Sequence, residues 1–365
     1  MQRVAVPIES INVSAYTIPT ETPESDGTLE WTSTTLVLVE AKAGARSGIG
    51  FTYADKSTAT LIADRLARVV EGRDAMNVAR SWQAMVAAIR NLGRPGIASM
   101  AIAGVDNALW DLKAQLLDIA LVSLLGGIRD CVPVYGSGGF TSYSTATLAK
   151  QLRGWVDAGI TRVKMKIGRE PANDVARVRH AREAIGPDTE LFVDANGAYS
   201  RKQALRFADA FAALDVRWFE EPVVSDDLEG LRLIRDRAPA SMDISAGEYG
   251  YDLVYFRRMC AAGAVDVLQA DATRCAGITG FMQTAALADA FLLPLSSHCA
   301  PSIHVHPCCA APGVRHLEYF HDHVRIERML FDGAIDPVGG AVAPDLTRPG
   351  MGLAFKYADA RRFAI

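Results

Sequence analysis

The spacing of apolar side chains changes along the chain, and each spacing predicts a different kind of element. Residues 11–18 and 34–41 are rich in β-branched and apolar side chains, which predicts two strands of an antiparallel sheet. The segment between them, residues 19–31, is polar and rich in turn-forming residues, so we expect a loop there. After it, apolar side chains recur with a helical period, which predicts helices at about residues 57–71, 76–92 and 98–119.

A second pattern begins after Cys131, where short apolar runs alternate with amphipathic segments. There are eight such runs: VPVYGS, RVKMKI, ELFVDA, RWFEEP, DISAGE, VDVLQAD, LPLSSH and RHLEYF. Eight strands that alternate with helices are typical of a closed β/α barrel. We therefore expect an α/β protein, with an α+β unit over residues 1–128, a barrel over 129–330, and a loop-rich tail over 331–365 that packs back on the first unit.

Chemically active side chains occur at the C-terminal ends of the predicted barrel strands. In chain order they are Lys164, Lys166, Asp194, Glu220, Glu248, Asp271, His298 and Glu318. From Lys166 onward, successive positions are separated by about one strand and one helix, so we expect these side chains at one mouth of the barrel. Barrel enzymes carry their active sites at the C-terminal mouth.

Three of these side chains predict a metal site. Asp194, Glu220 and Glu248 follow three successive strands, and so much negative charge held together requires a cation. A ligand set made only of oxygen favours Mg²⁺ over zinc or copper. Each residue alone could instead be a helix cap, but three in one register indicate a magnesium site.

Two lysines and a histidine are candidates for moving a proton. Lys164 and Lys166 lie two residues apart and share one face of a strand, so each charge should lower the pKa of the other until one lysine can act as a base. Asp271 can hold the imidazole of His298 in one tautomer, which makes His298 a second base or an acid.

Other residues with metal-binding chemistry do not share this register. We interpret the histidine pairs at 304–306 (HVH) and 321–323 (HDH) as structural. The six cysteines include no CxxC pair, so a thiolate zinc site has little support, and we expect reduced thiols that mainly contribute to packing.

Composition narrows the class of partner. The net charge is -4, from 38 basic and 42 acidic side chains, and no cluster of Lys and Arg indicates nucleic-acid binding. No apolar run reaches the length of about 18 residues that a membrane span needs, and the N-terminal segment does not resemble a secretion signal. We expect a cytoplasmic protein without membrane association.

Taken in order along the chain, these motifs resemble the mandelate racemase group of the enolase superfamily. The matching motifs are KMK at 164–166, VDANGAY at 193–199, WFEEP at 218–222, AGE at 246–248, HLEY at 316–319 and the segment IAGVDNALWDLKAQ at 102–115. The resemblance spans essentially the whole chain. It implies a modified TIM barrel of the (β/α)7β type, with a capping domain built from both chain ends.

The resemblance also implies the shared chemistry, which is abstraction of the proton α to a carboxylate with one Mg²⁺ per subunit. Lys164 and Glu318 would stabilise the enediolate, and Glu318 can donate a hydrogen bond only if it is protonated in the complex. Ser137 becomes a candidate for the serine that contacts the substrate carboxylate, and Asn196 and Tyr16 are further candidates for substrate binding.

The exact reaction stays open on the residues alone. Lys166 and His298 would lie on two faces of the substrate carbon, so two bases permit racemisation or epimerisation, whereas a base and an acid permit dehydration. The resemblance favours dehydration of a sugar acid and a homo-oligomer, with an octamer as the suggested assembly. A zinc hydrolase barrel would carry paired histidines on its first strand, where this chain has VYGSGG, and a non-catalytic relative would have no reason to retain both bases and all three ligands.

Two loops of the capping domain are expected to close over the small-molecule carboxylate substrate. Residues 18–31 carry four acids and no Lys or Arg, which would repel a second carboxylate unless Arg169 or Arg274 compensates, so we expect a monocarboxylic substrate. The acids are Glu21, Glu24, Asp26 and Glu30, of which Asp26 is the substrate-binding candidate. In the second loop, residues 48–54, we expect Phe51 and Tyr53 to cover the substrate and Gly48 and Gly50 to permit closure.

Overall fold

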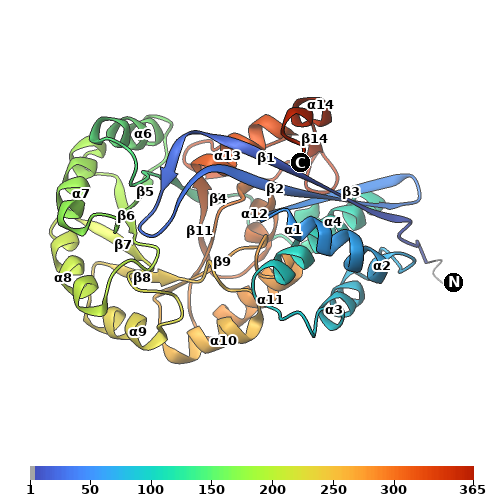
Figure 1. Cartoon of the computed structure of the whole chain (residues 1–365), viewed down its shortest axis with the longest axis horizontal. Coiled ribbons are helices and arrows are strands. Elements are labelled where there is room, and N and C mark those ends of the chain that lie inside the picture. The colour runs from blue at the N-terminus through green and yellow to red at the C-terminus, as the bar shows by residue number, and fades with distance from the viewer. Residues whose placement is uncertain (1–4) are drawn as a thin grey trace.

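The chain folds into a barrel with a cap beside it, as the computed structural model in Figure 1 shows. The structure describes residues 5–365, so the first four residues of the N-terminal segment interpreted above lie outside the described residues. Among the described helices, none combines the length and the hydropathy that crossing a lipid bilayer requires.

The cap contains a three-stranded antiparallel sheet covered by helices. Its strands are β1 (Ser10–Ser25), β2 (Glu30–Ala43) and β3 (Arg46–Tyr53), paired in that order. Its helical segments are α1 (Ser57–Leu61), the π-helical turn η1 (Ile62–Leu66), α2 (Ala67–Val70), α3 (Val78–Ala88), α4 (Ile97–Leu117) and α5 (Leu121–Leu125). The three helices predicted from the apolar period are therefore present, the first interrupted by the π turn.

The segment expected as a second closing loop is instead the strand β3, and its glycines serve packing. A Cβ at Gly48 would lie 2.2 Å from the backbone nitrogen of Leu112, and one at Gly50 would lie 2.3 Å from that of Ala108. Both neighbours belong to α4, so the two glycines let the helix approach the sheet closely. The prediction that they permit loop closure is wrong.

The segment expected as a polar loop, residues 19–31, is mostly strand. β1 continues to Ser25 and β2 begins at Glu30, with an irregular register between Pro19 and Glu24. In Figure 1 this hairpin extends from the cap over the barrel strands. Its polar composition suggested a loop, but pairing between the two strands and contacts with the barrel overrode that local preference.

The barrel has all eight predicted strands, parallel and closed by pairing between the first and the last. The strands are β4 (Val132–Gly138), β5 (Arg162–Lys166), β6 (Glu190–Asp194), β7 (Val216–Glu220), β8 (Asp243–Ala246), β9 (Val267–Ala270), β10 (Leu295–Ser297) and β11 (Val314–Phe320). The seven intervening helices are α6 (Thr145–Asp157), α7 (Pro171–Ile185), α8 (Arg201–Ala212), α9 (Leu228–Arg237), α10 (Leu253–Ala262), α11 (Gly277–Ala290) and α12 (Pro301–Ala310). The predicted (β/α)7β barrel with an α+β cap is confirmed.

Aromatic side chains fill the barrel interior beneath the mouth. Tyr135, Phe192, Trp218 and His316 come from four strands and contact one another with ring centroids 4.9 to 6.4 Å apart. This packed layer supports the polar side chains above it.

The C-terminal segment contacts both parts of the molecule. After α13 (His321–Leu330), the short strands β12 (Phe331–Asp332) and β14 (Ala354–Phe355) pair with each other, while β13 (Ala341–Val342) pairs with β4. The chain then ends through α14 (Tyr357–Ala360) and the 3-10 turn η2 (Arg361–Phe363). The proposed boundaries at residues 128 and 330 stay a prediction.

Candidate active site

The side chains predicted at the strand ends meet at the mouth of the barrel, where the structure has a cavity of about 430 Å³. Lys166, Glu248, His298 and Glu318 line this cavity. Lys164, Asp194, Glu220 and Asp271 lie buried next to them. Strand parity explains the grouping, because Lys164 and Lys166 project into the barrel while Val163 and Met165 are buried under the helices.

The three predicted metal ligands form one group. Carboxylate oxygens of Asp194, Glu220 and Glu248 lie within 4.8 Å of one another, and all three side chains are buried. The Oε2 atom of Glu248 accepts no hydrogen bond from residues 5–365, although Nε2 of His298 lies 3.3 Å away. A buried set of oxygen donors with a free acceptor atom fits a hard divalent cation.

The lysines are paired with these carboxylates rather than set against each other. Nζ of Lys164 lies 2.5 Å from Glu220 and 2.8 Å from Glu318, and Nζ of Lys166 lies 2.5 Å from Asp194. Burial lowers the pKa of each lysine, but the carboxylates more than offset it and raise both pKa values above the ordinary range. Lys164 does lower the pKa of Lys166, as predicted, but the surrounding negative charge outweighs that repulsion, so the net pKa of Lys166 is raised. That one lysine acts as a base stays a prediction.

Glu318 is a carboxylate in this environment. Burial opposes its ionisation, but Lys164 and His298 hold its pKa well below the ordinary value. The protonated form predicted above concerns the complex with substrate, and it stays a prediction.

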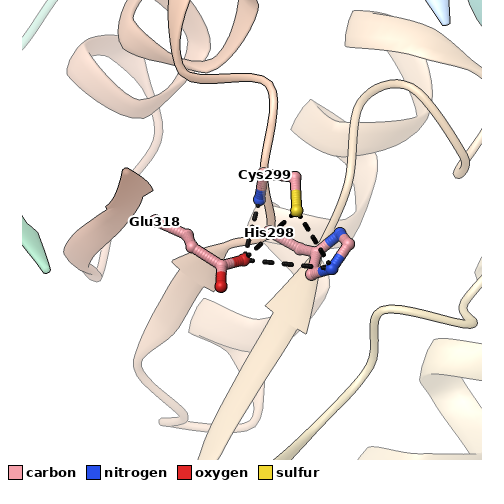
Figure 2. A group of neighbouring side chains, drawn as sticks. All are labelled: His298, Cys299 and Glu318. Carbon is pink, nitrogen blue, oxygen red and sulfur yellow. Dashed lines mark hydrogen bonds and ion pairs between the residues drawn. The ribbon is translucent and has the colours of Figure 1, made fainter. Parts of the chain in front are cut away.

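Asp271 orients His298. Its Oδ2 lies 2.8 Å from Nδ1 of the imidazole, and its Oδ1 accepts hydrogen bonds from the backbone nitrogen and the hydroxyl of Thr273. With the proton on Nδ1, the other ring nitrogen, Nε2, presents a lone pair to the mouth of the barrel. Figure 2 shows this imidazole beside Cys299 and Glu318.

Four of the six candidates for substrate binding lie at the mouth. Asn196, Asp26 and Tyr53 line the cavity. Ser137 pairs in register with Lys164, and its buried hydroxyl has no hydrogen-bond partner among the described residues. Their contact with a substrate stays a prediction.

Tyr16 and Phe51 lie away from the cavity. The ring of Tyr16 packs 5.1 Å from Phe355, and Phe51 is fully buried with its ring 4.8 Å from Phe331. Both belong to regular strands of the cap, and neither is among the residues that line the cavity, so the cover expected from Phe51 and the substrate contact expected from Tyr16 have no support in this structure.

Asp26 is also the only predicted lid acid that lines the cavity. Glu30 pairs with Arg169 at 3.1 Å, Glu21 is exposed next to His321, and Glu24 is buried and accepts a hydrogen bond from the indole of Trp31. Burial raises the pKa of Glu24 to about 8. Of the four acids that the sequence placed in this segment, Asp26 therefore borders the cavity, and its contact with a substrate stays a prediction.

Sequence reasoning missed several residues that line the cavity: Trp31, Ser33, Thr34, Thr35, Asp55, Tyr249, Phe320 and His323. His323 belongs to the HDH pair interpreted as structural, and its Nδ1 accepts a hydrogen bond from the backbone of Ala300. His304, from the HVH pair, is bonded to backbone atoms through both ring nitrogens, as a structural residue would be. All six cysteines are free, and only Cys131 is exposed.

Comparisons with known proteins agree with this geometry. A model of the "Mandelate racemase / muconate lactonizing enzyme, N-terminal domain" matches residues 12–126, and an "Enolase C-terminal domain-like" model matches residues 147–360. The 3,6-anhydro-alpha-L-galactonate cycloisomerase of Streptomyces coelicolor is 32% identical over 98% of this chain and 99% of its own length. The L-talarate/galactarate dehydratase of Salmonella typhimurium is 30% identical over 86% of this chain and 81% of its own length.

Solved structures of the same family are also similar to this chain. A mandelate racemase/muconate lactonizing enzyme-like protein from Rubrobacter xylanophilus superposes with a TM-score of 0.97 and 54% identity, over 98% of this chain and all of the other. A racemase from Streptomyces coelicolor, solved with bound magnesium, has a TM-score of 0.92 and 31% identity, over 98% of this chain and all of the other. The chain belongs to the mandelate racemase and muconate lactonizing enzyme family of the enolase superfamily, and it is an enzyme.

Proposed function

We propose that this enzyme removes the proton α to the carboxylate of a sugar acid and completes a dehydration. The observation that carries the proposal is the placement of Lys166 and His298, which border one cavity from strands β5 and β10 beside three clustered carboxylates. Elimination of water requires a base at the α-carbon and an acid at the hydroxyl of the neighbouring carbon, and these two side chains can supply them.

Asp194, Glu220 and Glu248 would hold one Mg²⁺. Their buried oxygen donors suit this ion, and a related racemase is known with bound magnesium. When bound, the ion supplies positive charge beside the substrate carboxylate, which makes the α-proton more acidic.

Each side chain at the mouth would have a separate role in the reaction. Lys166 would take the α-proton as the free amine, which requires that a bound cation offset the charge of Asp194 that raises its pKa in this structure. Lys164 and Glu318, the latter protonated in the complex, would hold the carboxylate oxygens on which negative charge develops. His298, oriented by Asp271 and carrying a proton on each ring nitrogen for this step, gives its Nε2 proton to the β-hydroxyl as the carbon–oxygen bond breaks and water leaves. The resulting enol then becomes a 2-keto-3-deoxy acid.

The cavity favours a substrate with a single carboxylate. Asp26 and Asp55 line it, while its arginine, Arg274, already lies 3.3 Å from Glu248 and 3.8 Å from Asp271. A second carboxylate would meet repulsion without an uncommitted cation to offset it. Comparing kcat/KM for an aldonate and the matching aldarate tests this, because a preference for the diacid would refute it.

An isomerase is the second candidate. The related cycloisomerase matches nearly the whole chain, and two bases around one carbon also permit racemisation or epimerisation. All these reactions share the first step, so the test is exchange of the α-proton for deuterium when sugar acids are incubated with the enzyme in D₂O. Exchange with formation of a keto acid supports the dehydratase, exchange with only isomeric products supports the isomerase, and no exchange with any acid refutes both.

We also propose that the protein is a cytoplasmic homo-oligomer, with an octamer suggested by the family resemblance. Exposed apolar side chains on loops of the surface, including Leu292, Val338 and Leu346, would suit contacts between subunits. Sedimentation velocity measures the assembly directly, and a monomer at all concentrations would contradict the proposal.

A further inference from the structure

Three buried side chains at the mouth of the barrel form a donor group next to the oxygen site, with Nε2 of His298 3.3 Å from Oε2 of Glu248. They are His298, Cys299 and Glu318, and Figure 2 shows them pointing toward one another from the end of β10 and from β11. They offer nitrogen, sulfur and oxygen, whereas Asp194, Glu220 and Glu248 offer oxygen alone.

The spacing of the three donor atoms matches metal coordination. Sγ of Cys299 lies 3.3 Å from Nε2 of His298 and 3.5 Å from Oε2 of Glu318, and these last two atoms are 3.9 Å apart. Three atoms at these separations lie on a circle whose centre is about 2.1 Å from each, close to zinc–nitrogen and zinc–oxygen distances and slightly short of the zinc–sulfur distance. An ion slightly out of that plane would lie slightly farther from all three atoms and would leave a fourth position for water.

The imidazole is already oriented for a ligand. Asp271 lies 2.8 Å from Nδ1 of His298, which fixes the proton there and leaves the lone pair on Nε2, the atom that faces Cys299. A carboxylate behind a histidine is the arrangement that commonly supports histidine ligands of zinc.

The backbone brings the thiol to the same point. Neighbouring residues of a strand project to opposite sides, but Cys299 follows the end of β10 and has a φ of 51°. This left-handed conformation turns Sγ back toward His298, and the backbone nitrogen of Cys299 also donates a 2.9 Å hydrogen bond to Oε2 of Glu318.

We propose that His298, Cys299 and Glu318 bind a thiophilic divalent cation such as Zn²⁺, and that the bound ion inhibits the enzyme. Sulfur and imidazole ligands favour zinc over magnesium, so this site and the oxygen site select different ions. As Sγ binds the ion, the thiol proton leaves to solvent, and the ion takes the Nε2 lone pair and the Glu318 carboxylate. Only the inhibition rests on the proposed function, because it removes the groups assigned to catalysis.

Binding is tested with Co²⁺ as a spectroscopic probe, in the presence of excess Mg²⁺ that occupies the oxygen site. A thiolate ligand gives a sulfur-to-cobalt charge-transfer band in the near ultraviolet, which oxygen ligands do not give. We expect this band in the unmodified protein and in Cys131→Ala, which removes the exposed cysteine. We expect at least a tenfold weaker band in Cys299→Ala, or in Cys299→Ser if the alanine variant does not fold.

The absence of the band in the unmodified protein, or its persistence in both Cys299 variants, would overturn the proposed site.

Inhibition is measured separately, as the loss of α-proton exchange on adding Zn²⁺ in excess Mg²⁺, with each variant normalised to its own activity without zinc. We expect the zinc concentration for half inhibition to rise at least tenfold in Cys299→Ala and not in Cys131→Ala. Equal sensitivity would place inhibition at the oxygen site and refute the regulatory role. A protein without any exchange activity would refute the proposed function, while the cobalt band would still decide whether the metal site exists.

Discussion

Replacing Asp271 with asparagine is expected to reverse the tautomer of His298. In the structure, Oδ1 of Asp271 accepts hydrogen bonds from the nitrogen of Thr273 at 2.6 Å and from its hydroxyl at 2.8 Å, while Oδ2 faces Nδ1 of the imidazole. An amide must keep its oxygen toward the backbone N–H, because an NH₂ group there would meet another donor. Its NH₂ group then faces Nδ1, which has to accept, and the ring proton moves to Nε2.

The expected loss of exchange rate follows from the protonation of Nε2 in the variant. A protonated Nε2 cannot accept a proton, and in the serine protease triad the corresponding substitution lowers kcat about 10⁴-fold, equivalent to about 5 kcal/mol. We expect Asp271→Asn to reduce exchange that depends on His298 as base by about 10³- to 10⁴-fold. Exchange that depends on Lys166 should fall by less than about tenfold, because Asp271 makes no contact with that lysine.

The assay is deuterium exchange at the α-carbon of two sugar acids that differ only in configuration at that carbon, followed by NMR. The two faces of the carbon report Lys166 and His298 separately. Asp243→Asn is the matched control, because Asp243 pairs with Arg315 and does not line the cavity. Equal losses for both epimers would refute the tautomer argument, whereas unchanged exchange for both would show that His298 does not act as a base toward either epimer.

Three further substitutions test the metal site, the packing of the cap and a buried acid. Glu220→Gln should weaken Mg²⁺ binding, measured by calorimetry, and should abolish α-proton exchange. Removing the metal with a chelator should also abolish exchange, and full activity after chelation would contradict the metal assignment. Gly50→Ala should lower the free energy of unfolding by more than about 3 kcal/mol in urea because its Cβ would meet the backbone of α4, whereas Gly154→Ala, with open space in helix α6, should raise it by about 0.5 to 1 kcal/mol. Since burial raises the pKa of Glu24 to about 8, its protonated form favours the folded state, so stability should fall as pH rises from about 4.5 to 8. In Glu24→Gln, the decrease in the free energy of unfolding over this pH range should be smaller, by on the order of a few kcal/mol. Identical pH profiles of stability for the variant and the unmodified protein would show that this carboxyl does not contribute.

The chemical core could be predicted from sequence because the position of a residue along a barrel strand determines where its side chain lies. Lys166, Asp194 and Glu220 end three successive strands, and parallel pairing in register brings such positions to one mouth. The charge state of the lysines could not be predicted in the same way, because it depends on distances such as the 2.5 Å between Lys166 and Asp194 that spacing along the chain does not give.

Cys299 illustrates a second limit. It occupies the position next to His298, and an extended backbone would have directed its side chain away from the imidazole. Its positive φ reverses that direction, and Glu318 reaches the same point from the neighbouring strand. Motif spacing for thiolate metal sites is defined for pairs of cysteines, so a set of one histidine, one cysteine and one glutamate gave no sequence signal.

The substrate is harder to infer than the reaction, because the two depend on different parts of the molecule. The side chains proposed for catalysis belong to one closed barrel, whereas Asp26 and Trp31 reach the cavity from the β1–β2 hairpin of the cap. The tip of that hairpin is fixed by contacts that local sequence does not reveal: a 2.6 Å hydrogen bond between the hydroxyls of Ser25 and Thr141, and the close approach of Gly27, where a Cβ would lie 2.4 Å from the carbonyl oxygen of Ala195. Substitutions in the hairpin can therefore change which acid fits while the proton-transfer groups stay in place, so specificity should follow residues 18–31 and reaction type should follow the ends of the barrel strands.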